Sequence, residues 1–229
     1  MSHQKIFTLD NLSLQDFGSE AELIPLLTPE DEEEMNNEEL PNNLAILPLR
    51  NMVLFPGVVI PITAGRDKSI RLINEANAEG KIIGVVAQKN EEDEDPTKND
   101  IHKIGTVAKI LRVLKMPDGN VTVILQGKKR FEIDTVITES PYIRAEVKEV
   151  SEKRPGKHDT EFVAIVDSIK ELAIQIIKES PNIPSEATFA IKNIESQSFL
   201  INFVTSNMNL SVKEKQDLSR RQMVIVCYG

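Results

Sequence analysis

Apolar and polar positions follow two patterns along this chain, short apolar runs before residue 150 and a four-and-three repeat after residue 160. Residues 44–62 read LAILPLRNMVLFPGVVIPI and hold two apolar runs of strand length, at 44–47 and 58–62. Phe55-Pro56-Gly57 between these runs indicates a turn or kink. The pattern predicts two short buried strands joined by a bend.

Two prolines in this stretch limit where its strands lie in a sheet. Proline has no backbone N–H to donate, so Pro48 and Pro61 indicate strands at a sheet edge or beside a bulge. Tight barrels are built from bent strands of this kind, and we expect one here.

Further strands follow, and the turns between them indicate antiparallel neighbours. Residues 81–87 form another apolar run, and the longest strand signals are 104–114 and 121–137. Residues 116–120, MPDGN, join these two with the Pro and Asp-Gly of a tight turn. Apolar and polar residues alternate in 143–148, which is typical of a strand with one wet face. Together these strands predict a closed or nearly closed small barrel, a form that removes exposed edges.

One helix is expected between the second and third strands. Asp67 is a candidate N-cap, Ile70 and Ile73 stand at helical spacing, and Gly80 stands where a left-handed residue ends a helix. We expect this helix to cover one end or one face of the sheet.

The last third of the chain predicts helices. The helix expected at 162–177 has an apolar stripe, made by Phe162, Val166, Ile169, Ala173 and Ile176 and widened by Ile165, Leu172 and Ile177. Two shorter helices are expected at 185–194 and 198–204, packed through Phe189, Ile194, Phe199, Leu200 and Phe203. Ser211 and Glu214 form a capping box, so a fourth helix begins there.

The opening stretch also resembles a known family. Leu47-Pro48-Leu49-Arg50-Asn51, followed by Leu54-Phe55-Pro56-Gly57 and Pro61, is similar to the signature that opens the N-terminal domain of the ATP-dependent protease Lon. The order of elements behind it fits as well, over residues 26–217. The resemblance implies an α+β fold: a small antiparallel, PUA-like β pseudo-barrel with one packed helix, followed by an all-α helical subdomain.

Composition and resemblance together divide the chain into four segments. We expect an acidic, largely disordered leader at 1–43, the Lon-type PUA-like domain at 44–153, a helical subdomain at 154–217 and an atypical tail at 218–229. A composition shift at 152–156 indicates the linker between the two domains. In the family the chain continues into an ATPase and a protease domain. This chain ends instead on MVIVCYG, and we expect that tail to be foreign to the family.

Charge is concentrated in the leader. Residues 1–43 hold eleven Asp and Glu against the single Lys5, whereas residues 44–229 hold twenty-five acids against twenty-six bases. A nearly neutral globular part disfavours nucleic-acid binding, because affinity for phosphates comes from clustered Lys and Arg. The leader is interpreted as a solubilising segment, with a partner-binding arm as the alternative.

The sequence offers no reactive constellation. The pairs Gly80-Lys81, Gly127-Lys128 and Gly156-Lys157 lack the partner glycine and the hydroxyl of a phosphate-binding loop, and no Gly-x-Ser-x-Gly occurs. The three histidines stand far apart, so no zinc site is expected. A second acidic run at 91–95 is interpreted as a solvated loop. One cysteine and no apolar run of membrane length favour a cytoplasmic protein.

Binding is the remaining activity, and turn apices are its candidates. Phe55 and Pro56 at one bend, with Met116 and Pro117 at another, are expected to form exposed apolar contacts for substrate. The alternatives are that Phe55 plugs the end of the barrel and that Met116 belongs to an uninvolved turn. Phe199 and Phe203 are alternatively an oligomer surface.

By resemblance, this is the non-catalytic N-terminal region of a Lon-type ATP-dependent serine protease. That implies partners: unfolded or damaged polypeptides as substrates, and further copies in a homo-oligomeric ring. No cofactor or metal is expected in this chain, because ATP and Mg²⁺ are implied only for domains that would follow it. A stand-alone adaptor with no protease attached is the main alternative, and an RNA-binding PUA-like module is a third.

Overall fold

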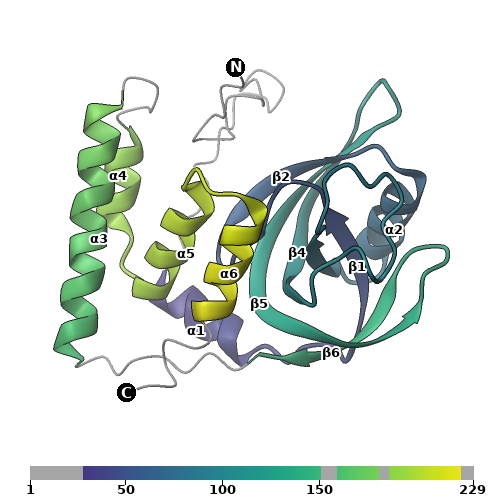
Figure 1. Cartoon of the computed structure of the whole chain (residues 1–229), viewed down its shortest axis with the longest axis horizontal. Helices are drawn as coiled ribbons and strands as arrows, with labels where there is room; N and C mark the ends of the chain where they lie inside the picture. Colours follow the sequence, from purple (N-terminus) through teal and green to yellow (C-terminus); the bar gives the residue numbers. More distant parts are fainter. Residues whose placement is uncertain (1–27, 151–158, 181–185, 223–229) are drawn as a thin grey trace. The chain divides into compact units, whose positions relative to one another are not determined.

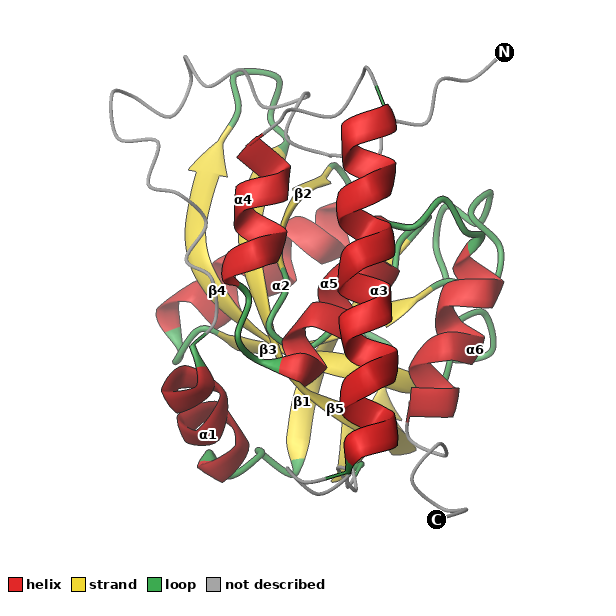
Figure 2. Cartoon of the chain, turned by 90° about the vertical axis from the view of Figure 1, so that its left-hand side faces the viewer, coloured by secondary structure: helices red, strands yellow, loops and turns green. Residues whose placement is uncertain are grey.

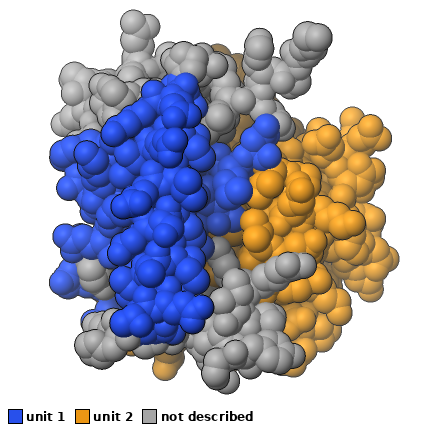
Figure 3. All heavy atoms as spheres, turned by 60° about the vertical axis from the view of Figure 1, so that its left-hand side comes forward, with its two compact units in different colours: residues 1–33, 155–209 blue, residues 34–154, 210–229 orange. Residues whose placement is uncertain are grey.

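The computed structural model describes residues 28–150, 159–180 and 186–222. The leader before residue 28, the linker expected at 152–156 and the apolar tail at 223–229 lie outside the described residues. The chain divides into two compact units: a helical unit of residues 1–33 and 155–209, and a β unit of residues 34–154 and 210–229 (Figure 3). Each unit is described by itself.

Six strands build the β unit (Figure 1). They are β1 (Asn43–Leu49), β2 (Val59–Ala64), β3 (Ile82–Ala87), β4 (Ile104–Lys115), β5 (Val121–Thr138) and β6 (Arg144–Glu149). They lie in the order β2-β5-β4-β3-β1-β6, and β6 also pairs with β5. That last pairing closes a small barrel from β5 through β4, β3, β1 and β6, so the expected class of fold is confirmed. Two details differ from the expectation, because β1 and β3 run parallel and β2 stays outside the closed ring.

The long strand β5 makes this closure because it bends. Its first part, Val121–Gln126, pairs with β2, and its last part pairs with β6. Register shifts interrupt its pairing with β6 after Ile133 and again after Val136. Such bulges increase the local twist of a strand, which is how one strand can serve both an open arm and a closed barrel.

Both prolines lie at positions where the sheet needs no backbone hydrogen bond from their nitrogen. Pro61 is in β2, the end strand of the sheet. In β1, Leu49 O accepts from Gln88 N–H on the β3 side, at 2.7 Å, whereas Ile46 N–H donates to Ile143 on the opposite side, at 2.8 Å. Because the backbone groups of successive strand residues point to opposite sides, the nitrogen of Pro48 points away from β3. On that side β6 pairs only with residues 43–45 of β1, so no strand requires an N–H from Pro48.

An apolar cluster fills the barrel. Its buried members come from all parts of the ring and are Leu44, Ile46, Val86, Ile101, Val107, Phe131, Ile133, Ile143, Ala145 and Val147. Three of them, Ile143, Ala145 and Val147, lie at the alternate apolar positions expected from residues 143–148, since successive strand residues face opposite sides of the sheet.

Helix α2 (Asp67–Ala78) packs on β1 and β3 and buries Leu72 and Ile73. Its N-cap is Arg66, whose side chain makes no capping hydrogen bond, so the expectation that Asp67 is the cap is wrong by one residue. Gly80, after the helix end, has φ +109°, a backbone conformation that glycine adopts more readily than any other residue, and this agrees with the expectation.

The helical unit contains α3 (Thr160–Glu179), α4 (Glu186–Asn193) and α5 (Gln197–Asn207), and α3 packs on both of the others. Figures 1 and 2 show α4 alongside α3. Asp159 caps α3 by accepting from Phe162 N–H at 3.0 Å, and Ser196 caps α5 by accepting from Phe199 N–H at 3.0 Å. These are the local signals that favour helix starts.

Part of the acidic leader is ordered. Helix α1 (Pro29–Asn37) covers the run that was expected to be disordered, and that expectation is wrong for these residues. Thr28 and Asp31 bond to each other at the start of α1, and Met35 is buried. Within the helical unit, the buried Glu32 carboxylate accepts a hydrogen bond from the Ser196 hydroxyl.

Helix α6 (Val212–Gln222) belongs to the β unit rather than to the helical one. Ser211 and Glu214 form the expected capping box, with Ser211 N–H donating to Glu214 at 2.8 Å. Gln216 donates to Ile104 O at 2.8 Å, and the buried Arg130 donates to Ser219 at 3.0 Å. The compact helical unit therefore ends at residue 209, whereas the expected helical subdomain ran to residue 217.

Candidate functional site

The first expected contact, Phe55-Pro56, is not on the surface. Phe55 is fully buried and Pro56 is buried with it, so their expected exposure is wrong. The Arg130 guanidinium lies over the Phe55 ring at 5.9 Å from its centroid, and Thr106 donates to Leu54 O at 2.6 Å. A bend rich in Pro and Gly can point into the protein interior as well as into solvent, and here the surrounding strands bury it.

Gly127 is what allows this bend to come so close to β5. A Cβ at residue 127 would lie 2.3 Å from Phe55 O, closer than any side chain tolerates. Gly57 N–H donates to Gly127 O at 2.9 Å, which ties the bend to the strand directly. The sequence signal for this approach was a glycine within a strand pattern.

The second expected contact, Met116-Pro117, is exposed. Met116 is 41% exposed, and Pro117 is exposed at the tip of the turn between β4 and β5. The turn is well formed, since Met116 N–H donates to Asn120 O at 2.9 Å and Gly119 has φ +88°. Leu111, on β4, is as exposed as Met116.

We call this part of the β unit the arm: β2, the β4 residues Arg112–Lys115 and the β5 residues Val121–Gln126. Its three strands are hydrogen-bonded in the order β2-β5-β4, and its tip carries Met116 and Pro117. Such an arm presents apolar side chains on a rigid support, which lowers the entropy lost when a partner binds.

The helical unit exposes more apolar surface than the sequence pattern suggested. Ile165, Leu172 and Ile176 of α3 are each more than half exposed, and Phe189 of α4 is 72% exposed. Ile165, Leu172 and Ile176 recur at intervals of seven and four, so they share one face of the helix. The expected packing through Phe189 is therefore wrong, whereas Ile194, Phe199 and Leu200 are buried as expected.

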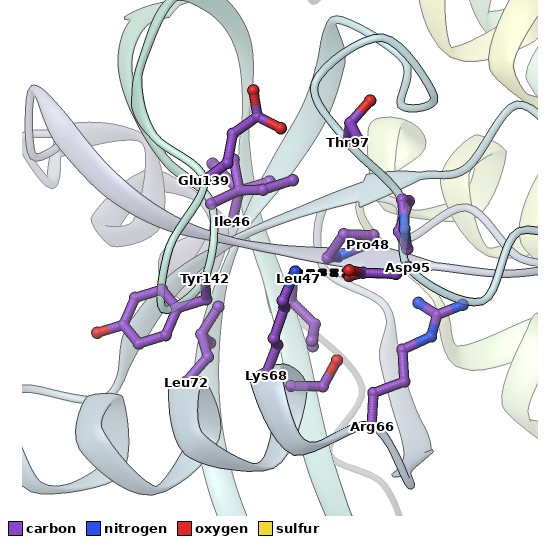
Figure 4. A pocket seen from close by; sticks show the side chains of 13 residues that line it. Ile46, Leu47, Pro48, Arg66, Lys68, Leu72, Asp95, Thr97, Glu139 and Tyr142 are labelled. Atoms are coloured by element: carbon purple, nitrogen blue, oxygen red, sulfur yellow. Dashed lines mark hydrogen bonds and ion pairs between the residues drawn. The ribbon is translucent and has the colours of Figure 1, made fainter.

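A small cavity lies in the β unit between α2, β1 and the segments 95–97 and 139–143 (Figure 4). Leu47, Leu72 and Ile143 are among its apolar lining residues. Lys68 and Asp95 close one side with an ion pair of 2.7 Å, drawn as a dashed line in Figure 4. Its volume is about 50 Å³. That space suits one or two water molecules, whereas ligand pockets measure roughly 300–1,000 Å³.

The ionisable groups around this cavity are explained by structural contacts. Burial lowers the pKa of Arg66, and the nearby Arg50 charge lowers it further. Burial and a hydrogen bond of 2.6 Å to Glu75 raise the pKa of Tyr142. The same bond, with one from Arg71, lowers the pKa of Glu75. No acid and base here face each other across a space where a substrate fits.

Two further kinds of feature concern the described residues as a whole, a metal site and a membrane-spanning helix. Within residues 28–150, 159–180 and 186–222, no three His, Cys, Asp or Glu side chains are placed to hold a metal ion. Across the same ranges, no helix combines the length and apolar character needed to cross a membrane. What the described surface offers is a set of exposed apolar side chains on the arm and on the helices.

Comparison with known proteins gives one consistent result. The family model described as "ATP-dependent protease La (LON) substrate-binding domain" matches residues 43–219. The "Lon protease" of Flavobacterium johnsoniae is 83% identical over 218 residues, which are 95% of this chain and 27% of that protein. The "Lon protease" of Cytophaga hutchinsonii is 50% identical over 197 residues, 86% of this chain and 24% of that protein.

The solved "N terminal domain of Mycobacterium avium complex Lon protease" has the same fold. Its TM-score is 0.62 at 20% identity, over 80% of this chain and 95% of that one. The present chain spans about a quarter of the length of the curated relatives that it matches.

Proposed function

The chain belongs to the family of ATP-dependent protease La (LON) substrate-binding domains, and we propose that it binds exposed apolar segments of unfolded or damaged polypeptides. The observation that carries this proposal is the exposure of large apolar side chains on the arm and on the helical unit. Met116 stands at the tip of the arm and Leu111 stands on β4 just before it, whereas Ile165, Leu172 and Ile176 stand on one face of α3.

Apolar side chains at such positions favour weak, unselective binding. Burying a Met or Leu side chain completely against a partner contributes about 1.5–3 kcal/mol, and a turn apex buries only part of it. Folded proteins keep their apolar side chains inside, so a surface of this kind distinguishes unfolded from folded chains. Several weak contacts along one chain then add to a useful affinity.

We further propose that the bound segment passes to a motor and a serine protease located beyond this chain, in a cytoplasmic homo-oligomer. ATP and Mg²⁺ belong to that motor. In support of this, the cavity beside α2 is far smaller than a nucleotide, and its lysine, Lys68, is paired with Asp95. Capture is therefore the part of the reaction that this chain performs.

The test is a titration of unfolded casein against the parent chain and Met116→Ser. Removing the exposed side chain is expected to weaken binding about fivefold, which corresponds to roughly 1 kcal/mol of lost contact. Lys115→Ser is the matched control, since Lys115 is the exposed neighbour of Met116 and is not apolar.

The second variant, Leu172→Ser with Ile176→Ser, tests the helical unit in the same way, with the exposed Glu171→Ser as its control. Unchanged casein binding by both apolar variants would reject these residues as the contact surface. Absence of casein binding by the parent chain would reject the proposed function itself.

A further inference from the structure

Among the described residues, strand β2 is the one strand that is paired along one side only over its whole length. It is the end of the order β2-β5-β4-β3-β1-β6, and β6 at the other end returns to pair with β5. In the part of the chain that the structure describes, no strand pairs with the second edge of β2. Barrel closure was expected to remove such edges, and here it leaves this one along a whole strand, whereas in β4 only the part beyond Ile110 lacks a partner on its β3 side.

The register determines which backbone groups of β2 face outward. Gly127 N–H donates to Val58 O at 2.9 Å, and the register continues with Ile60, Ile62 and Ala64 opposite alternate residues of β5. In an antiparallel pair every second residue bonds to its neighbour strand. Val59, Pro61 and Thr63 therefore point their backbone groups away from β5.

Two side-chain observations agree with this assignment. The hydroxyls of Thr63 and Thr122, which are directly opposite, lie 3.1 Å apart. Side chains approach most closely in the pairs that exchange no backbone hydrogen bonds, which is the type that the register gives to Thr63. Pro61 has no N–H, and a proline is tolerated where its nitrogen faces away from the neighbouring strand.

We propose that this outer edge of β2 binds an extended segment of unfolded polypeptide by β-strand addition. The edge offers three carbonyl acceptors, at residues 59, 61 and 63, and two N–H donors, at Val59 and Thr63. Only another extended backbone matches that row of groups. The inference rests on the proposed function and adds a mode to it, because backbone pairing binds chains of any sequence.

A foreign strand fits this edge better than a second copy of the chain does. Two β2 edges brought together antiparallel about Pro61 would oppose proline to proline and lose both bonds at the centre. A polypeptide with an N–H opposite Pro61 loses one bond only. A proline on an edge strand is also a recognised obstacle to edge-to-edge association of identical copies.

The edge is continuous with the apolar surface of the arm. The residues of β5 that hold β2, Val121–Gln126, begin just after the turn that carries Met116 and Pro117. Both β2 and that turn therefore share one rigid three-stranded support. Pairing along β2 supplies binding without sequence selection, and the apolar tip adds preference for apolar segments.

The test changes the number of outward donors on β2 and measures binding of a fluorescent ten-residue peptide of alternating Thr and Val, by anisotropy. Pro61→Val adds one outward N–H and is expected to tighten binding about fivefold, while Thr63→Pro removes one and weakens it about fivefold. Thr63→Ala is the matched control, because it keeps the N–H and loses only the side-chain contact with Thr122. The same peptide with every backbone nitrogen methylated is expected not to bind.

The outcomes separate this inference from the proposed function. Equal peptide affinity for Pro61→Val and the parent chain, with circular dichroism showing an intact fold, would overturn strand addition even if Thr63→Pro fails to fold. Dimerisation of the parent chain that competes with the peptide would overturn the choice of occupant. If casein binds the parent chain and all edge variants equally, the edge is rejected while the proposed function stands.

Discussion

The β unit and the helical unit differ in how far their large apolar residues are buried. In the β unit, Phe55 and Phe131 are fully buried, and the exposed large apolar residues are Leu111, Met116 and Ile137. In the helical unit, Phe189 and three residues of α3 are more than half exposed. A closed sheet has an inside that its own strands fill, whereas a helix with apolar residues around much of its circumference packs only where a neighbour exists.

This difference shows how one chain combines a stable core with an exposed apolar surface. The barrel core joins residues from Leu44 to Val147, so its stability depends on contacts between distant parts of the sequence. Exposed apolar residues on α3 and at the tip of the arm take little part in such contacts. Residues for binding can therefore be changed with small effects on folding, and paired substitutions inside and outside the buried regions test that separation.

The largest effect is expected from Phe131→Ala. Removing a ring from the centre of the barrel leaves a cavity, and the cost is about 4 kcal/mol in the free energy of unfolding of the β unit. Phe189→Ala removes the same ring from an exposed position and is expected to change stability by less than about 0.5 kcal/mol. Urea unfolding followed by amide hydrogen exchange reports the units separately. Similar losses for both variants would show that the two units do not differ.

A middle-sized effect is expected from Gly127→Ala. The new Cβ collides with the Phe55 carbonyl oxygen, and the required backbone shift costs about 2 kcal/mol of β-unit stability. Gly119→Ala is the comparison on the arm, where no atom lies within 4 Å of the new Cβ and only the φ of +88° opposes it, at about 1 kcal/mol. If Gly119→Ala proved the more damaging of the two, the close approach at Phe55 would not be a constraint on the fold.

The smallest effect is expected from pH, through His102. Burial, with the charge of Lys89 and Arg220, lowers the pKa of His102 in the folded β unit, although Asp217 opposes this. The unfolded chain therefore binds the proton more readily, so stability is full above the unfolded pKa of about 6.5 and falls as the pH drops through it. Unfolding of the parent chain and His102→Gln at pH 7.5 and 5.5 measures the difference. A parent chain no more sensitive to this change than His102→Gln would contradict the assignment.

Local sequence signals predicted most elements and several of their ends. The turn at Met116–Asn120, the capping box at Ser211 and the glycine after α2 appear in the structure as expected, because each depends on residues within a few positions. The leader helix α1 was missed because its run of Glu and Asp carries almost no apolar periodicity. Within it, the burial of Glu32 depends on Ser196, a partner far away in the sequence.

The candidate site was predicted less well than the fold. Two bends with similar sequences, Phe55-Pro56 and Met116-Pro117, gave the same prediction of an exposed contact, yet the first is buried and the second is exposed. A bend faces inward or outward according to the strands around it. Gly127 on β5 allows the first bend to lie close to that strand, and no residue near Phe55 in the sequence indicates this contact.

The sequence by itself determined the strands, every helix after α1, the turns and the family, since these follow from residue spacing, from proline and glycine, and from the opening signature at residues 47–61. Only the tertiary structure decided which apolar residues stay exposed, that β6 closes the barrel and that β2 keeps an open edge. Spacing along a chain fixes which residues share a face. Whether that face is covered depends on a second segment, and that segment is brought there by contacts between residues far apart in the sequence.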